Sequence, residues 1–147
     1  MGVRRVRRDN QLLRQEFLAR GRNAIVATRR LTEGPQLSPN WYLWDGTRFL
    51  ISTSDGTAKV ANIRRDPHMS ICIDDAASNG ELYVTAYGIG EVITGQTARE
   101  LSLAIIAKYQ SPELVVPHWE GISSRNVRVV IAMAPTRWVW ARALLDS

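Results

Sequence analysis

Residues 48–67 read RFLISTSDGTAKVANIRRDP, and the expected fold is built outward from this stretch. Apolar and hydroxyl residues over 49–53 predict a strand, a short polar turn follows, and a helix is expected to begin near Thr57 and to stop at Pro67. Lys59 falls in the first turn of that helix, where the helix dipole already places partial positive charge. A cation is unfavourable there unless an anion shares the site.

The residues around Lys59 indicate which anion would fit. Thr53, Ser54 and Thr57 carry hydroxyl groups, and the first turn of a helix offers backbone N–H groups without partners in the helix. Together with the lysine, these groups would make a cradle for a phosphate. A surface lysine beside an ordinary threonine cap explains the same residues, so both interpretations stay open at this point.

The composition is that of an ordinary globular chain. Its 147 residues are 45% hydrophobic and 22% charged, which suits one domain over residues 1–147 with a full core. No apolar run approaches the roughly 20 residues that span a bilayer, and the start of the chain lacks the apolar core of a secretory signal, so no membrane partner is expected. The single Cys72 excludes an internal disulfide and suits a reducing cytoplasm, which is the expected location.

The positive charge of the chain is concentrated at its start. The net charge is +5, and without Arg4, Arg5, Arg7 and Arg8 the rest of the chain is nearly neutral. We expect residues 1–8 to form a flexible, solvated basic arm, with a weak contact to an anion as the alternative. Helix-turn-helix, zinc-finger and aromatic–basic RNA-binding patterns are all missing, so no nucleic-acid partner is expected.

Periodicity and turn residues predict a mainly β chain. Strands are expected at 24–30, 36–44, 49–53, 68–74, 82–93 and 127–133, with an edge strand at 137–142, and helices at 9–20, 57–66 and 97–109, whereas 110–126 reads as irregular. Short loops between consecutive strands favour an antiparallel barrel with peripheral helices over a doubly wound sheet. Gly88 and Gly90 fall on one face of their strand, which predicts a close backbone approach at a barrel corner.

No side-chain pattern for catalysis or metal binding stands out. His68 and His118 lie fifty residues apart without cysteine or carboxylate neighbours at ligand spacing, so no metal site is expected. Cys72 alternates with apolar residues and reads as a packing residue, and Asp74–Asp75 reads as a solvated turn. The catalytic side chains therefore stay unknown, and a bound cofactor is expected to carry any chemistry.

Four segments in this order resemble a known family. AIVAT (24–28), GPQLSPNWY (34–42), DGTRFLISTSDGTAKVANIRRDP (45–67) and YVTAYGIGEV (83–92) are similar to the pyridoxamine 5′-phosphate oxidase-like split-barrel flavoproteins, and most of all to the branch that uses the deazaflavin coenzyme F420. The resemblance covers about 17–109. It implies a homodimer of six-stranded antiparallel split barrels of the FMN-binding type, with two cofactor sites at the subunit interface.

The resemblance also implies which residues contact the cofactor. Carried over by motif position, the residues that would hold the phosphate or its linker are Thr53, Thr57, Ala58 and Lys59, with Ser52 in the same site. Those that would line the ring are Ser38, Pro39, Asn40 and Trp41, with Thr28 nearby. Further aromatic candidates for substrate walls are Trp44, Tyr87 and Trp119, but packing in the core or at the dimer interface is the favoured explanation for each.

The sequence departs from the vitamin B6 oxidases of this superfamily at the phosphate site. Those enzymes generally carry an arginine immediately before the phosphate-site lysine, and a longer C-terminal segment with basic residues, whereas this chain has Ala58 and ends at Ser147. Pyridoxamine phosphate oxidation is therefore not expected. The smaller positive charge favours the phosphodiester of F420 over the phosphomonoester of FMN.

The expected function is that of an F420-dependent reductase, which transfers a hydride to an unknown small-molecule substrate. Two alternatives share the fold. One is an FMN-binding oxidoreductase, and the other is a protein that binds a cofactor or a tetrapyrrole without turnover.

Overall fold

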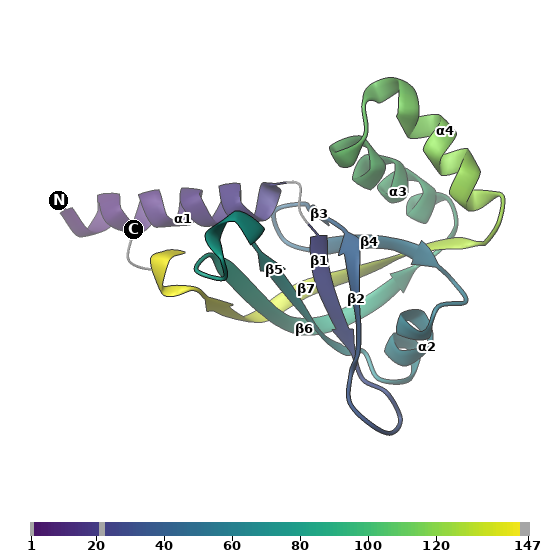
Figure 1. The fold of residues 1–147 in the computed structure, drawn as a ribbon, viewed down its shortest axis with the longest axis horizontal. Helices are drawn as coiled ribbons and strands as arrows, with labels where there is room; N and C mark the ends of the chain where they lie inside the picture. Colours follow the sequence, from purple (N-terminus) through teal and green to yellow (C-terminus); the bar gives the residue numbers. More distant parts are fainter. Residues whose placement is uncertain (1, 21–22, 145–147) are drawn as a thin grey trace.

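The computed structural model describes residues 2–20 and 23–144, with side chains from residue 11 onward except that of residue 143. The helices are α1 (Gly2–Ala19), α2 (Ala58–Arg65), α3 (Gly95–Tyr109) and α4 (Pro112–Ser123), with short 3-10 turns η1 (Ala76–Ser78) and η2 (Arg142–Leu144). The strands are β1 (Asn23–Thr28), β2 (Gln36–Trp41), β3 (Leu43–Trp44), β4 (Phe49–Ser54), β5 (His68–Asp74), β6 (Tyr83–Ile93) and β7 (Arg128–Trp140). Figure 1 shows how they are arranged.

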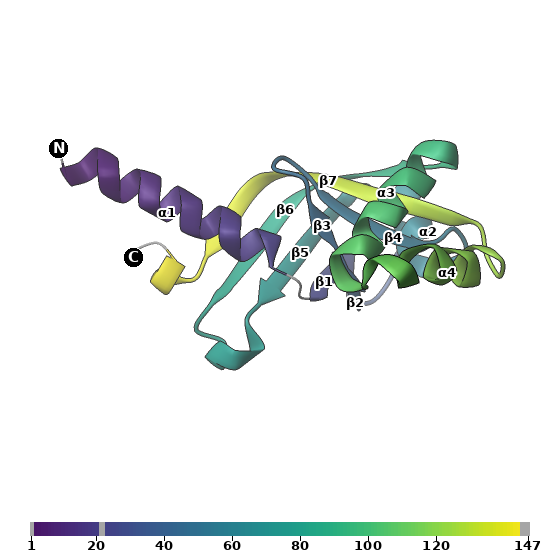
Figure 2. The same cartoon turned by 90° about the horizontal axis from the view of Figure 1, so that it is seen from above.

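The strands form one antiparallel sheet that curls into an open barrel. Their order is β2-β1-β5-β6-β7-β4-β3, and the curl brings β2 at one edge into contact with β4 near the other. The helices lie around this sheet, with α1 projecting from one end and α3 and α4 lying towards the other (Figure 2). The predicted mainly β split barrel is thus confirmed, although its sheet has seven strands where six were expected.

The extra strand arises because the predicted strand 36–44 is broken at Tyr42. The backbone N–H of Tyr42 donates to the hydroxyl of Tyr109 at 3.1 Å, so it leaves the ladder there. The buried hydroxyl of Tyr42 in turn donates to the carbonyl of Leu18, 2.6 Å away. This side chain ties the end of α1 to the sheet, and its position separates β2 from the two-residue β3.

The last predicted strands are one strand, β7. The sequence predicted a strand at 127–133 and a separate edge strand at 137–142. In the structure Pro135 pairs with Gly88 where the register between β6 and β7 shifts. Proline is tolerated at such a bulge because the bulge needs no N–H donor from it, so the strand runs through.

Two helix predictions also need correction. The helix predicted at 9–20 begins at Gly2, so α1 includes the residues expected to form the basic arm. The segment predicted as irregular contains α4, with Pro112 in its first turn and Pro117 inside it. Proline fits the first turn of a helix, where its missing N–H is not needed, whereas Pro117 made the sequence read as a helix break.

The core has two parts, one on each side of β4 and β7. Inside the barrel, alternate residues of these strands pack with those of β1, β5 and β6, and Phe17 and Leu18 of α1 close one end. Outside it, α3 packs against the other face of β4 and β7 through Leu50, Ile105 and Val130. Both faces of β4 are therefore buried, so packing on both sides holds this strand, which leads into α2, rigidly in place.

Gly88 and Gly90 confirm the predicted close approach. A Cβ atom at Gly88 would lie 2.6 Å from the backbone oxygen of Ala134, and one at Gly90 would lie 2.6 Å from the sulfur of Met69. The first neighbour is backbone and cannot easily move, whereas the second is the end of a flexible side chain.

We therefore expect Gly88→Ala to lower the free energy of unfolding by about 1–3 kcal/mol, the usual cost of overpacking. Gly90→Ala is the matched control and should lower the free energy of unfolding clearly less, because the side chain of Met69 can shift. Urea unfolding of the two variants and the wild type measures the difference. Equal losses of stability in the two variants would show that the backbone of β7 shifts as readily as the side chain of Met69.

Candidate cofactor site

Lys59 is buried at the start of α2 and has few partners. Its side chain is 9% exposed, and its Nζ donates to the hydroxyl of Thr53 over a long 3.4 Å. Thr57 takes the N-cap position but makes no capping bond, because its hydroxyl donates to the carbonyl of Ser54 at 3.0 Å. The surface-lysine interpretation is therefore wrong, and the first N–H groups of α2 are left without a side-chain cap.

A second cation, Arg128, lies at the same end of β4. It is the first residue of β7 and pairs with Ser54 in the sheet register. Its Nη1 donates to the hydroxyl of Ser54 at 3.0 Å and its Nη2 to that of Ser52 at 3.1 Å, while its buried Nε has no partner. Sequence reasoning missed Arg128, because only the pairing of β4 with β7 brings it here.

The two cations lie on opposite faces of the end of β4, because Ser52 and Ser54 accept from Arg128 and Thr53 accepts from Lys59. Burial, and then the positive charge of Arg128, lower the pKa of Lys59, and burial lowers the pKa of Arg128. Within the described residues, no carboxylate forms an ion pair with either side chain. No carboxylate of the described residues therefore compensates either charge, and the chemistry of the donors around Lys59 fits an anion such as a phosphate.

Two cavities lie beside the end of β1 and the loop that follows it. The smaller, of about 240 Å³, is lined by Ala58 and Asn62 of α2 and by Gln36 of β2, among others. The larger, of about 620 Å³, lies over β1, β5 and β6, and Arg30 lines both. Of the residues around Lys59, Ala58 lines the smaller cavity, whereas Lys59, Thr53 and Thr57 line neither.

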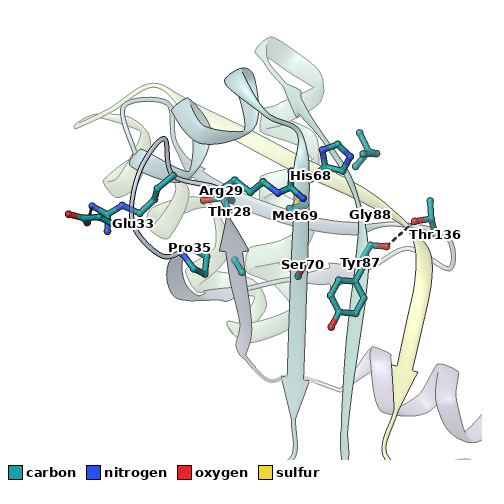
Figure 3. A pocket seen from close by; sticks show the side chains of 13 residues that line it. Thr28, Arg29, Glu33, Pro35, His68, Met69, Ser70, Tyr87, Gly88 and Thr136 are labelled. Carbon is teal, nitrogen blue, oxygen red and sulfur yellow. Dashed lines mark hydrogen bonds and ion pairs between the residues drawn. The ribbon is translucent and has the colours of Figure 1, made fainter.

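Thr28 lines the larger cavity at the end of β1. Its buried hydroxyl accepts a hydrogen bond from Asn62 of α2 at 3.0 Å and donates to the side-chain oxygen of Gln36 at 3.3 Å. Figure 3 shows Thr28 and Arg29 at the end of β1, next to the paired strand β5 that carries His68 and Ser70, and all four residues line the larger cavity. The network fixes the position of α2 against β1 and β2.

His68 carries a further polar contact at the rim of the larger cavity. Its Nδ1 lies 2.7 Å from Asp66, whose other oxygen accepts from Arg29 at 3.1 Å. The hydrogen bonds from His68, and then from Arg29, lower the pKa of Asp66 to about 2. Tyr87 of β6 lies on the other side of the cavity, where its carbonyl accepts a hydrogen bond from Thr136 (Figure 3).

The structure places the predicted ring-lining residues apart from these cavities. Ser38, Pro39, Asn40 and Trp41 lie on β2 and line neither one. The amide of Asn40 donates to the carbonyl of Ser38 at 2.8 Å, and the ring of Trp41 stacks on Tyr109 with 4.6 Å between centroids. Of the predicted phosphate residues, Thr53, Thr57 and Lys59 come together between β4 and α2. Ser52 lies on the other face of β4, and Ala58 is the one that lines a cavity.

The remaining predicted aromatic residues divide between the core and the cavity. Trp44 packs against Phe49 and Trp138, and Trp119 belongs to α4. Tyr87 alone of these lines the larger cavity. Within residues 2–20 and 23–144, no three His, Cys, Asp or Glu side chains gather as metal ligands, and no helix is long and apolar enough to cross a membrane.

The curled antiparallel sheet with its peripheral helices defines a split-barrel protein. Residues 14–139 match the family model of pyridoxamine 5′-phosphate oxidase, and the chain belongs to that family.

Solved structures share the fold at low identity. An F420 reductase is 22% identical with a TM-score of 0.66, over 85% of this chain and 94% of that one. A conserved hypothetical protein from Mycobacterium tuberculosis is 21% identical with a TM-score of 0.74, over 93% of this chain and 88% of that one. HutZ, the haem storage protein of Vibrio cholerae, is 12% identical with a TM-score of 0.70, over 88% of this chain and 93% of that one.

The burial of Lys59 has a consequence for stability without a bound anion. Because its pKa is lowered in the folded state, the unfolded chain binds more protons, so the stability of the protein rises as pH increases towards the ordinary lysine value. Below the lowered pKa the cost of the buried charge is present in full. We expect Lys59→Met to raise the free energy of unfolding at neutral pH by about 0.5–2 kcal/mol, with the gain shrinking at alkaline pH.

Lys108→Met is the control for this prediction. The Nζ of Lys108 donates to the carbonyl of Tyr42 at 3.0 Å and lies 3.7 Å from the centre of its ring, so its loss should lower stability. Urea unfolding at neutral and alkaline pH, in buffers without phosphate, compares both variants with the wild type. A loss of stability in Lys59→Met at neutral pH would contradict the prediction.

Proposed function

We propose that this protein is an oxidoreductase that uses the deazaflavin coenzyme F420 to reduce a small molecule. The observation that carries the proposal is the buried ammonium group of Lys59, which has hydroxyl neighbours but no carboxylate partner within the described part of the chain. Membership of the pyridoxamine 5′-phosphate oxidase family supports a cofactor with a phosphate group. The fold shared with an F420 reductase supports the choice of deazaflavin.

The residues present fit the anionic tail of such a cofactor. Lys59, Thr53 and Thr57 would hold its phosphate together with the uncapped N–H groups of α2. When bound, the deazaflavin supplies a hydride to an electrophilic carbon of the substrate. The larger cavity would receive the substrate, and its apolar wall from Met69 and Ile89 would exclude water from the reacting atoms.

A specific observation supports FMN as the second candidate. FMN ends in a phosphomonoester, which carries more negative charge at neutral pH than the phosphodiester of F420. Arg128 supplies a second positive charge at the end of β4 that would offset it. A function as an FMN-dependent oxidoreductase would use the same phosphate residues.

The coenzyme preference is tested by titrating the purified protein with F420 and with FMN, followed by changes in visible absorbance. We expect saturable binding of F420, and Lys59→Ala should weaken it about tenfold or more, because a charge-assisted hydrogen bond is lost. Arg48→Ala removes an exposed arginine paired with Asp45 and serves as control. Binding of FMN alone would favour the second candidate, and binding of haem but of neither coenzyme would favour a tetrapyrrole-binding role.

We further propose that the protein works as a homodimer. The outer face of the sheet carries exposed apolar side chains from neighbouring strands, among them Ile25, Tyr87 and Val139, beside the open side of the larger cavity. Exposed apolar patches of this kind are characteristic of protein–protein contacts. A second copy of the chain on this face would close the cavity and protect these side chains from water.

Light scattering tests the dimer. The wild type should have twice the mass of one chain, and Ile25→Glu should give a monomer, because it places a charge on the apolar outer face. Leu114→Glu changes a side chain of similar exposure on α4 and should leave the mass unchanged. A wild-type monomer that binds its coenzyme tightly would contradict the proposal.

A further inference from the structure

His68 and Asp66 form a hydrogen-bonded pair at the rim of the larger cavity, which His68 and Arg29 help to line. The Nδ1 of His68, the first residue of β5, lies 2.7 Å from Oδ1 of Asp66. The same oxygen accepts the backbone N–H of His68 at 3.2 Å, and the other carboxylate oxygen accepts from Arg29 at 3.1 Å. The turn between α2 and β5, together with Arg29 at the end of β1, therefore holds the carboxylate against the imidazole ring.

The carboxylate determines which ring nitrogen of a neutral His68 carries the proton. The hydrogen bonds from His68, and then from Arg29, lower the pKa of Asp66 to about 2. At neutral pH this group is therefore ionised, and an ionised carboxylate only accepts hydrogen bonds. Nδ1 must then be the donor, which leaves Nε2 to bind and release the exchangeable proton. None of the described residues is hydrogen-bonded to Nε2.

His68 is the group in the lining of this cavity that suits proton transfer near neutral pH. The other charged side chains of the lining are those of Arg29, Arg30 and Glu33. Arginine does not lose its proton in proteins, and the carboxylate of Glu33 pairs with Arg30 at 2.8 Å. Histidine is the side chain that ordinarily changes its charge in this pH range. The side chain of His68 is 59% exposed, so water reaches it and restores a proton that it has given away.

The floor of the cavity leaves room for a substrate beside this ring. On the outer face of the sheet, Ala27 of β1 pairs with Ser70 of β5, and Ser70 pairs with Tyr87 of β6. Figure 3 shows Pro35 on one side of Ser70 and Tyr87 on the other. His68 lies two residues before Ser70 and therefore on the same face of β5. The volume of about 620 Å³ is in the range of small-molecule sites, and the hydroxyl of Ser70 adds a donor beside the histidine.

The proposed reduction requires a proton as well as a hydride. When a hydride adds to the far carbon of an alkene conjugated to a carbonyl group, a C–H bond forms and the C=C π bond breaks. The electron pair moves onto the carbonyl oxygen, which gives an enolate. The substrate is reduced and the deazaflavin that supplies the hydride is oxidised. The enolate then takes one proton at the carbon next to the carbonyl group, and a general acid accelerates this step.

We propose that His68 is a catalytic residue that protonates the enolate of a conjugated carbonyl substrate, and that Asp66 is its positioning residue. This inference rests on the proposed reductase function and names the class of substrate that the larger cavity would take. The Nε2–H of the imidazolium form donates its proton to the enolate, and water returns a proton to the neutral ring. The negative charge of Asp66 stabilises the imidazolium form without removing its proton.

A stable mimic of the enolate tests the role of His68 without any coenzyme. The probe is para-nitrophenol, which is yellow as the phenolate and nearly colourless as the phenol. We titrate the coenzyme-free protein with it at a pH below the pKa of the free phenol. The wild type should bind it saturably as the yellow phenolate, paired with the imidazolium of His68. His68→Gln should weaken the binding about tenfold or more and abolish the yellow colour of the bound probe, because a charge-assisted hydrogen bond is lost.

Two further variants guard against a trivial result. His118→Gln removes a histidine that stacks on Trp41 with 5.2 Å between ring centroids and does not line the cavity, so binding should be unchanged. Asp66→Asn keeps the shape of the side chain but removes its charge. Its affinity should fall between those of the wild type and His68→Gln, and a smaller share of the bound probe should be yellow.

Circular dichroism establishes that each variant is folded before its affinity is interpreted. A wild type that does not bind para-nitrophenol, or equal affinity and colour in the wild type and His68→Gln, would overturn the inference. An unchanged share of the yellow form in Asp66→Asn would remove Asp66 from its positioning role.

Titration with F420 and FMN separates this inference from the proposed function. Full coenzyme binding in a protein whose affinity for para-nitrophenol does not depend on His68 would refute the proton donor and keep the coenzyme. Binding of the phenolate that depends on His68, in a protein that binds neither coenzyme, would support His68 as the acid–base group of the cavity and refute the coenzyme.

Discussion

The buried positive charge of Lys59 is the constraint on which the interpretation of this structure depends. An ammonium group loses hydration when it is buried, and the protein normally restores the loss with a carboxylate or with several hydrogen bonds. Here the Nζ of Lys59 lies 3.4 Å from the hydroxyl of Thr53. Burial, and then the positive charge of Arg128, lower the pKa of the lysine. A fold retains such an arrangement when an outside group supplies the missing negative charge, and strained charges of this kind gather at functional sites.

The barrel topology explains how the site comes together. β4 is buried on both faces, so its end is a rigid platform, and the turn after Ser54 delivers the start of α2 beside it. The pairing of β4 with β7 adds Arg128, which is distant in sequence but opposite Ser54 in the register. At the other side of α2, Asn62 is hydrogen-bonded to Thr28 of β1, which fixes the helix between the cationic end and the larger cavity.

Local signals in the sequence predicted the parts of the fold that depend on neighbouring residues. The strand, turn and helix of residues 48–67 and the close approach at Gly88 follow from alternation, turn residues and the missing side chain of glycine. The break of the second predicted strand depends on Tyr42 reaching Leu18 and Tyr109, contacts that no local pattern contains. The helix around Pro117 was not predicted, because a proline inside a helix is locally unfavourable. Packing of α4 against α3 nevertheless makes this helix stable.

Reliance on residues that are close in sequence also affected the predicted site and, with it, the choice of cofactor. The motif around Lys59 predicted a phosphate cradle, and the alanine at position 58 then favoured a singly charged phosphodiester, because the prediction counted only charges that are close in sequence. The sheet register adds the charge of Arg128. Electrostatic attraction depends on distance in space, so Ala58 no longer argues against a phosphomonoester. The charges at the end of β4 then suit a phosphomonoester as well as a phosphodiester, so charge alone does not select one of the two coenzymes.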